Sequence, residues 1–167
     1  MITEDRRGTG ILGCLSINDN TAIASYKNYT NSGVIDQKKV DAVVKDSIQK
    51  LNIKTPSGKT LIQSLSGGNQ QKVIIARWLA NNPDILIMDE PTRGIDVGAK
   101  YEIYCIINDL VAEGKSVIMI SSELPEILGM SDRVYVMNEG RMVAELPIEE
   151  ATSEVIMSKI LQSSAKK

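Results

Sequence analysis

The spacing of hydrophobic residues changes once along the chain, near position 69. Before this point, residues at helical spacing follow Asp36, a side chain suited to cap a helix, and form the stripe Val40, Val43, Val44, Ile48 and Leu51. After it, helical patterns alternate with short runs that carry apolar residues on both faces. Such runs are typical of strands covered on two sides, so the pattern predicts an α/β fold.

The elements expected after this point can be placed by residue number. Helices are predicted over residues 69–81, 97–113, 123–129 and 150–162. Strands are predicted over residues 85–88, 117–120, 133–137 and 141–145, the last two joined as a hairpin through Asn138-Glu139-Gly140. Residues 1–35 mix polar and short apolar pieces and give no clear prediction.

Composition narrows the chemistry that the chain can perform. Its 19 basic and 21 acidic residues give a net charge of −2, and no basic stripe interleaved with aromatic residues supports nucleic-acid binding. The absence of histidine excludes Ser-His-Asp and Cys-His catalysis and His-containing zinc sites. Cys14 and Cys105 are too few for a disulfide framework and indicate a reducing compartment. No apolar run approaches the ~20 residues of a membrane span, and the first residues lack the apolar core of a secretion signal.

A serine and two glycines stand directly before the apolar helix that starts near position 69. Ser66, Gly67 and Gly68 belong to the segment Leu-Ser-Gly-Gly-Asn-Gln-Gln-Lys. Glycines let a large anion approach the backbone, and a helix start directs unpaired N–H groups toward it. The segment therefore predicts a phosphate-binding helix start, with a flexible Ser-Gly turn as the alternative.

Two acidic residues follow the buried strand predicted at 85–88. Asp89 and Glu90 stand at its carboxyl end, where ligands gather in open α/β sheets. Since adjacent strand residues point to opposite sides, the two acids are expected to do different work. We assign Asp89 to the shell of a Mg²⁺ ion, through water, and Glu90 to orienting and deprotonating an attacking water. The alternative is a solvated acidic strand end.

Together these motifs resemble those of the ATP-binding-cassette ATPases. In that family the Leu-Ser-Gly-Gly sequence is the signature motif, Asp89-Glu90 match the end of Walker B, and Asp96 matches the D-loop. The wording LSGGNQQKV with DEPTRGIDVGAK is similar to the second cassette of tandem ATPases that drive bacterial sugar importers of the galactose/methyl-galactoside, ribose or xylose type. Lys54-Thr55-Pro56 and Val73-Ile74-Ile75 are most similar to the galactose group.

The resemblance implies an incomplete P-loop NTPase-like (RecA-like) core joined to part of the helical subdomain. Residues 1–82 would hold the Q-loop remnant, the helical subdomain and the signature helix. Residues 83–167 would hold the C-terminal part of the core with Walker B, the D-loop and a C-terminal helix. Glu4 stands at the Q-loop position, where most cassettes have glutamine, and Ser122 stands at the position of the switch histidine.

The family's roles carry over onto these positions. The resemblance implies that Glu90 and Ser122 are catalytic, that Asp89 binds Mg²⁺, and that ATP is contacted by Ser66, Gly67, Gly68, Asn69, Glu4 and Asp96. A serine hydroxyl donates one hydrogen bond but cannot become cationic. A site that uses Ser122 is therefore expected to hydrolyse ATP slowly or to serve mainly for nucleotide binding.

The sequence contains no P-loop, the motif that holds the β- and γ-phosphates in such ATPases. Its one Gly-Lys-Thr, at 58–60, has Ile53 where the motif needs glycine and follows Pro56 instead of a buried strand, so it is predicted to be a polar turn. We expect the chain to be the later part of one cassette and to be inactive alone. Because a sheet without its first strands exposes an edge, self-association is also expected.

The resemblance implies a fragment of the ATP-binding and ATP-hydrolysing subunit that energises a bacterial sugar importer. Its expected partners are a second cassette, sugar-permease membrane subunits and, indirectly, a periplasmic sugar-binding protein. The expected location is peripheral, at the cytoplasmic face of the cell membrane. Two alternatives stay open: a noncatalytic interaction module that keeps a cassette surface, and a soluble cassette protein of translation or repair.

Overall fold

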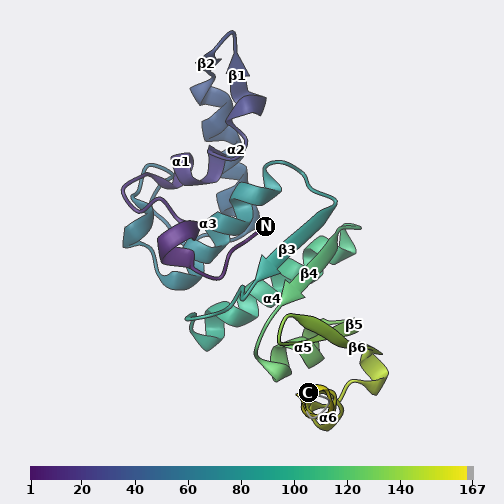
Figure 1. Ribbon diagram of the computed structural model, residues 1–167. Coiled ribbons are helices and arrows are strands. Elements are labelled where there is room, and N and C mark those ends of the chain that lie inside the picture. The colour runs from purple at the N-terminus through teal and green to yellow at the C-terminus, as the bar shows by residue number, and fades with distance from the viewer. Residues whose placement is uncertain (165–167) are drawn as a thin grey trace. The chain divides into compact units, whose positions relative to one another are not determined.

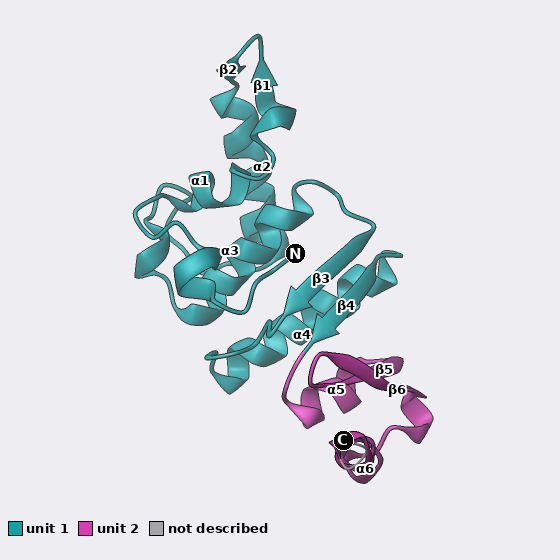
Figure 2. Cartoon of the chain, viewed as in Figure 1, with its two compact units in different colours: residues 1–120 teal, residues 121–167 magenta. Residues whose placement is uncertain are grey.

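The computed structural model describes residues 1–164, drawn from purple to yellow in Figure 1. The chain forms two compact units, residues 1–120 and 121–167 (Figure 2). This division follows contacts within the chain. The boundary expected at 82/83 instead separates two parts with different functions, and it stays a prediction. The last three residues of the expected second part lie outside the described residues.

The first 35 residues form short elements that only tertiary contacts can support. They comprise a π-helical turn at Arg6–Gly10, α1 at Ile17–Ala22, a 3-10 turn at Tyr26–Tyr29, and the strands β1 at Thr30–Asn31 and β2 at Val34–Ile35. None is long enough to show a hydrophobic period, which is why the sequence gives no clear prediction here.

Helix α2, Gln37–Lys50, begins where the sequence predicts. The Asp36 carboxylate accepts hydrogen bonds from the backbone N–H groups of Lys38 and Lys39, which satisfies two amides at the helix start. Val40 and Val44, one turn apart on the predicted stripe, are buried. The predicted cap and apolar stripe are both confirmed.

A parallel pair of strands forms the longer of the two sheets in the first unit. Strand β3, Ile85–Asp89, pairs in parallel with β4, Ser116–Ile120, and α4, Val97–Ala112, connects them. The N-terminal segment lies along β3 through Ile2, whose backbone N–H donates to Ile87 at 2.8 Å and whose carbonyl accepts from Asp89 at 3.0 Å. A strand, a helix and a parallel strand in succession make the βαβ unit expected of an α/β fold.

Within the described residues, only one face of this sheet is covered. Leu86 and Met88 are buried on that face, whereas Ile85, Ile118 and Ile120 on the other are 58%, 52% and 48% exposed. The prediction that these strands are covered on both faces is therefore wrong for the described chain. An apolar run reports that a strand can be buried on two sides, but the burial itself depends on which other elements pack against it.

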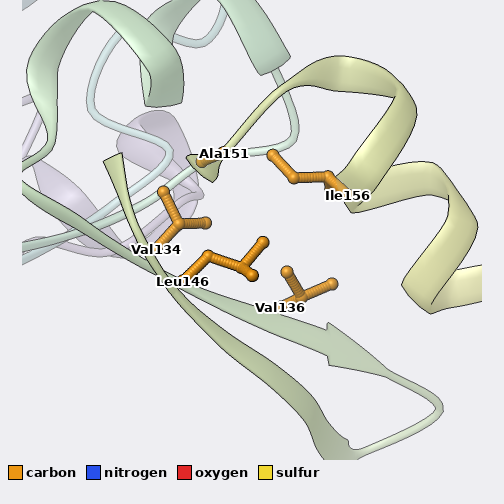
Figure 3. Packing of buried hydrophobic residues seen from close by; sticks show 5 residues of the cluster. All are labelled: Val134, Val136, Leu146, Ala151 and Ile156. Carbon is orange, nitrogen blue, oxygen red and sulfur yellow. The ribbon is translucent and has the colours of Figure 1, made fainter. Parts of the chain in front are cut away.

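The second unit is a hairpin packed on a helix. After α5, Leu124–Met130, strand β5, Arg133–Asn138, pairs antiparallel with β6, Arg141–Pro147, and α6, Ser153–Ser164, follows a 3-10 turn at Ile148–Glu150. Glu139 and Gly140 both have positive φ, 48° and 75°, as a type I′ hairpin turn requires. The small core consists of Val134, Val136, Leu146, Ala151 and Ile156 (Figure 3). The predicted hairpin is confirmed.

Among residues 1–164 no helix has both the length and the apolar character needed to cross a membrane.

Candidate functional site

Helix α3, Gly67–Leu79, begins directly after Ser66, two residues earlier than the sequence predicts. Ser66 is the N-cap residue in extended conformation, yet its side chain accepts no hydrogen bond from the helix amides. Instead, the Asn69 amide nitrogen Nδ2 donates to Ser66 Oγ at 2.9 Å. The first N–H groups of any helix have no hydrogen-bond partner within the helix. At the start of α3 the serine side chain does not supply that partner.

The two glycines of this helix start have different neighbours. A Cβ placed on Gly68 would lie 2.4 Å from the Cβ of Ala99 in α4, so this glycine is needed for close packing of α3 on α4. A Cβ on Gly67 would meet only the end of the Arg6 guanidinium, at 3.0 Å. At Gly68, the close packing of α3 on α4 is thus sufficient to require glycine, whether or not an anion binds there.

A buried lysine in the second turn of α3 connects this helix to α4. The Lys72 side chain is 2% exposed, and its Nζ lies 2.8 Å from Glu102 Oε2 in α4 and 2.9 Å from the carbonyl of Asn52. Lys54 approaches the other oxygen of Glu102 at 3.6 Å. The hydrogen bond from Lys72 is the main cause of a lowered pKa at Glu102. The ion pair fixes α3 against α4.

A second buried cation ties α3 to the N-terminal segment. Arg77 donates from Nε to the carbonyl of Asn20 at 2.6 Å, from Nη1 to that of Gly10 at 2.8 Å, and from Nη2 to Asn20 Oδ1 at 2.8 Å. Burial lowers the pKa of Arg77. Neither Lys72 nor Arg77 is among the residues predicted from the sequence, although a charged residue inside an apolar helical run is a signal that could identify both.

The acid pair stands at the end of β3. Asp89 is the last residue of the strand and lies on the same face as Ile118 and Ile120 by the pairing register. Glu90 has φ 46°, so the chain leaves the strand there, although the Glu90 N–H still donates to the carbonyl of Ile120 at 2.8 Å. Strand alternation therefore ends at Asp89 and does not set the direction of the Glu90 side chain, so the different roles expected of the two acids stay a prediction.

The segment around Glu4 reaches the turn that follows the acid pair. Glu4 Oε1 forms an ion pair with Arg93 Nη1, and Arg6 Nη1 donates to the Arg93 carbonyl at 3.4 Å. The Asp5 carboxylate caps the π-helical turn Arg6–Gly10 by accepting from the N–H of Gly8 at 2.8 Å. The structure therefore joins the expected Q-loop position to the residues after Glu90.

Asp96 and Ser122 belong to different units of the chain. Asp96 is the N-cap of α4, where its carboxylate accepts from the N–H of Ala99 at 3.0 Å. Ser122 belongs to the second unit, next to Ser121, whose Oγ accepts from the N–H of Glu123 at 3.0 Å. The roles expected of Asp96 and Ser122 toward a nucleotide stay predictions.

Residues 58–60 form a turn, as predicted. The Gly58 carbonyl accepts from the N–H of Asn18 at 2.8 Å, and the Thr60 carbonyl accepts from the N–H of Ile17 at 3.0 Å. No strand leads into the turn, and the next element after it is the 3-10 turn Ile62–Ser64. A P-loop needs a strand before it and a helix after it, so these residues lack its context.

Few of the described residues could serve as ligands of a magnesium ion. No group of three or more His, Cys, Asp or Glu side chains among residues 1–164 could enclose a metal ion. Mg²⁺ is commonly held by one or two carboxylates together with water and substrate phosphates. Asp89, half-buried at the strand end, offers one such carboxylate.

Solved structures share this fold. One, titled as an ATP-binding cassette of an ABC transporter, aligns with a TM-score of 0.75 at 24% identity and covers 90% of this chain and 63% of that chain. Another, titled as an ATP-binding cassette bound to ADP and Pi, has a TM-score of 0.69 at 22% identity and covers 83% and 59%. The class defined by the fold is thus the ATP-binding cassette, a P-loop NTPase fold.

Sequence comparisons identify the family to which the chain belongs. The family model described as ABC transporter matches residues 6–93, just over half of the chain, and the chain belongs to this family. The Galactose/methyl galactoside import ATP-binding protein MglA of Clostridium tetani (strain Massachusetts / E88) is 59% identical over 94% of this chain. The Ribose import ATP-binding protein RbsA of the same organism is 51% identical over 93% of it. The chain spans about 31% of the length of each of these relatives.

Proposed function

We propose that the complete protein to which this chain belongs is the ATP-hydrolysing subunit of a bacterial sugar importer. The names of the relatives support a galactose, methyl galactoside or ribose importer over a cassette protein of translation or repair. The observation that carries the proposal is the start of α3, where the N-cap serine leaves the helix amides without a side-chain cap. Such amides, together with the helix dipole, favour an anion at this point.

The start of α3 would bind the γ-phosphate of an ATP whose other phosphates are held by a second cassette. The donors would be the Ser66 hydroxyl and the backbone N–H groups of Gly67 and Gly68. The ion pair of Lys72 with Glu102 supports this role, since it holds the first turns of α3 rigidly against α4. A donor set that is already in place loses little entropy on binding.

Asp89 and Glu90 would serve a nucleotide on the chain's own side. Asp89 would hold Mg²⁺ through water, and when bound this ion neutralises charge on the phosphates. Glu90 would orient the attacking water and accept its proton. Glu4, at the Q-loop position, Asp96, at the D-loop, and Ser122, as a neutral donor to the γ-phosphate, would complete this site.

Closure of two cassettes on ATP and their opening after hydrolysis would drive the transport cycle. The partners would be the second cassette and the sugar-permease subunits, with a periplasmic binding protein delivering the sugar. The protein would act at the cytoplasmic face of the membrane. In this arrangement residues 1–82 would contain the helical subdomain, and residues 83–167 part of the nucleotide-binding core.

The test is ATP turnover by the complete protein carrying Glu90→Gln. We expect loss of a general base to lower turnover by a factor of about 100 or more, with ATP binding retained. The matched control is Glu113→Gln, which changes an exposed acid at the end of α4 and should leave turnover unchanged. Turnover that survives Glu90→Gln would contradict the assignment.

The 167-residue chain by itself is expected to hydrolyse no ATP, because its sequence has no P-loop lysine or glycine cradle for the β- and γ-phosphates. Turnover by the isolated chain that Glu90→Gln abolishes would contradict this expectation.

A further inference from the structure

Both polar atoms of the Asn69 side chain form hydrogen bonds with other groups of the chain. Asn69 Oδ1 accepts a hydrogen bond from the backbone N–H of Lys54 at 2.8 Å, and Asn69 Nδ2 lies 2.9 Å from Ser66 Oγ. A backbone N–H can only donate, so the atom facing Lys54 must be the amide oxygen. The amide orientation is therefore fixed, and it is the NH₂ group that faces Ser66.

This orientation determines the direction of the Ser66 hydroxyl. Because Ser66 Oγ accepts from Asn69, its own hydrogen must point to a different acceptor. Within residues 1–164 the hydroxyl donates to no other group, and Ser66 is exposed. Its O–H and the uncapped amides of α3 are thus donors at the same helix start.

We propose that Asn69 is a positioning residue that fixes the polarity of the Ser66 hydroxyl, so that this hydroxyl donates to an anionic oxygen of the nucleotide. The inference rests on the proposed function and refines it. Asn69 would then act through Ser66, because one hydrogen of its NH₂ group is directed to Ser66 Oγ and its oxygen is held by the Lys54 N–H.

The support behind Asn69 is rigid. The Lys54 N–H that holds Oδ1 belongs to a loop whose preceding residues are anchored: Ile53 is buried, and the Asn52 carbonyl accepts from the buried Lys72. Lys72 lies one turn after Asn69 on the same helix. Helix and loop therefore hold each other, and Asn69 bridges them at the surface.

The test is Asn69→Asp in the complete protein. Aspartate has nearly the same shape, and one oxygen still accepts from Lys54, but the other faces Ser66 as an acceptor. The serine hydroxyl must then turn and donate to the new carboxylate, which withdraws its hydrogen from the nucleotide. We expect kcat/KM for ATP to fall roughly tenfold to hundredfold, the effect of one hydrogen bond to a charged group.

The stability of the Asn69→Asp variant distinguishes a positioning role of Asn69 from a merely structural one. A carboxylate near the start of a helix is favourable, so the unfolding midpoint of Asn69→Asp should be equal to or above that of the unchanged protein. A structural role predicts that activity and stability fall together. A fall in both by the same variant would overturn the inference.

A Ser66→Ala background separates hydroxyl polarity from direct charge repulsion. If Asn69 acts through Ser66, Asn69→Asp should cost little further activity in Ser66→Ala. An equal cost in both backgrounds would overturn the inference, because the new charge would then act on the nucleotide directly. Asn69→Ala is a second variant, for which we expect a smaller loss that also vanishes in Ser66→Ala.

Failure of this inference and failure of the proposed function give different results. If Ser66→Ala leaves ATP turnover unchanged, the proposed nucleotide site at the start of α3 is wrong. If Ser66→Ala lowers turnover but Asn69→Asp does not, the site stands and the positioning role of Asn69 is refuted.

Discussion

The start of α3 and the end of β3 are supported in different ways. Near the start of α3, buried Lys72 connects the helix to α4 and to the carbonyl of Asn52, at 2.8 and 2.9 Å. In the last turn of the helix, buried Arg77 connects it to the N-terminal segment through hydrogen bonds of 2.6–2.8 Å. At the end of β3, the face that carries Asp89 also carries the half-exposed Ile118 and Ile120. One site is fixed by a buried polar network, and the other stands at the edge of an open apolar face.

The contrast shows how far a local network can define a site. Lys72 and Arg77 bind backbone carbonyls and side chains from remote parts of the chain and so hold α3 in place, which makes substitutions there costly. The exposed face of β3 and β4 has few contacts to lose, so substitutions there should cost the chain little stability.

The largest loss of stability is expected from Glu102→Gln, because this change leaves the charge of Lys72 buried without its carboxylate partner. Removing one partner of a buried pair costs about 3–5 kcal/mol, and the partial exposure of Glu102 places this pair toward the lower end. Urea unfolding of the chain measures the effect. Glu113→Gln is the control, and a loss equal to the control's would show that Lys72 needs no counter-ion.

The same pair makes stability depend on pH. Because the folded-state pKa of Glu102 is below its ordinary value of 4.5, the ionised carboxylate stabilises the fold above that pH. This contribution is lost as the pH falls through the lowered pKa. The stability difference between the unchanged chain and Glu102→Gln should therefore shrink on acidification below pH 4.5, as urea unfolding at several pH values would measure. A constant difference would contradict the ion pair.

Arg77→Met should have the next largest effect. It leaves the carbonyl oxygens of Gly10 and Asn20 buried without their hydrogen-bond donor. We expect the free energy of unfolding to fall by about 2–3 kcal/mol in total. Hydrogen exchange should rise in the N-terminal segment before it rises in α4. Arg141→Met, at an exposed position, is the control. An equal loss in both variants would show that Arg77 does not hold this segment.

Gly68→Ala should cost about 1–3 kcal/mol, because its Cβ would overlap that of Ala99 at 2.4 Å. Gly67→Ala is the matched control, since a flexible guanidinium can move away. Ala99→Gly in the same chain should restore part of the lost stability in thermal unfolding. No rescue would mean that the two helices do not meet at this point.

Ile118→Lys should have the smallest effect on stability, about 0.5 kcal/mol or less, since this side chain is 52% exposed. The same change should reduce the self-association expected of the chain, because it places a charge on the open apolar face. Light scattering over a concentration series tests this. A chain that is monomeric at every concentration before substitution would contradict the expected association.

The sequence predicts the features that depend on neighbours along the chain. The cap at Asp36, the stripe through Val40 and Val44, and the turn at Gly140 each follow from residues a few positions apart, and the structure confirms them. The motifs around Ser66 and Asp89 are also local, which is why their resemblance to a known family is visible in the amino-acid sequence alone.

Features that depend on remote partners could not be predicted. The partners of Arg77 lie 57 and 67 positions away, and nothing in the sequence specifies them. The left-handed turn at Glu90 and the open face of β3 are likewise set by packing. Apolar runs look alike whether or not another element covers them.

The central claim is that the first amides of α3 bind the nucleotide. Residue-resolved hydrogen–deuterium exchange on the complete protein with Glu90→Gln, with and without Mg²⁺ and ATP, tests it most directly. We predict that exchange at the N–H groups of Gly67 and Gly68 slows when ATP is bound, while the turn at Glu139 and Gly140 is unchanged. Unchanged exchange at both glycines under saturating ATP would contradict the claim.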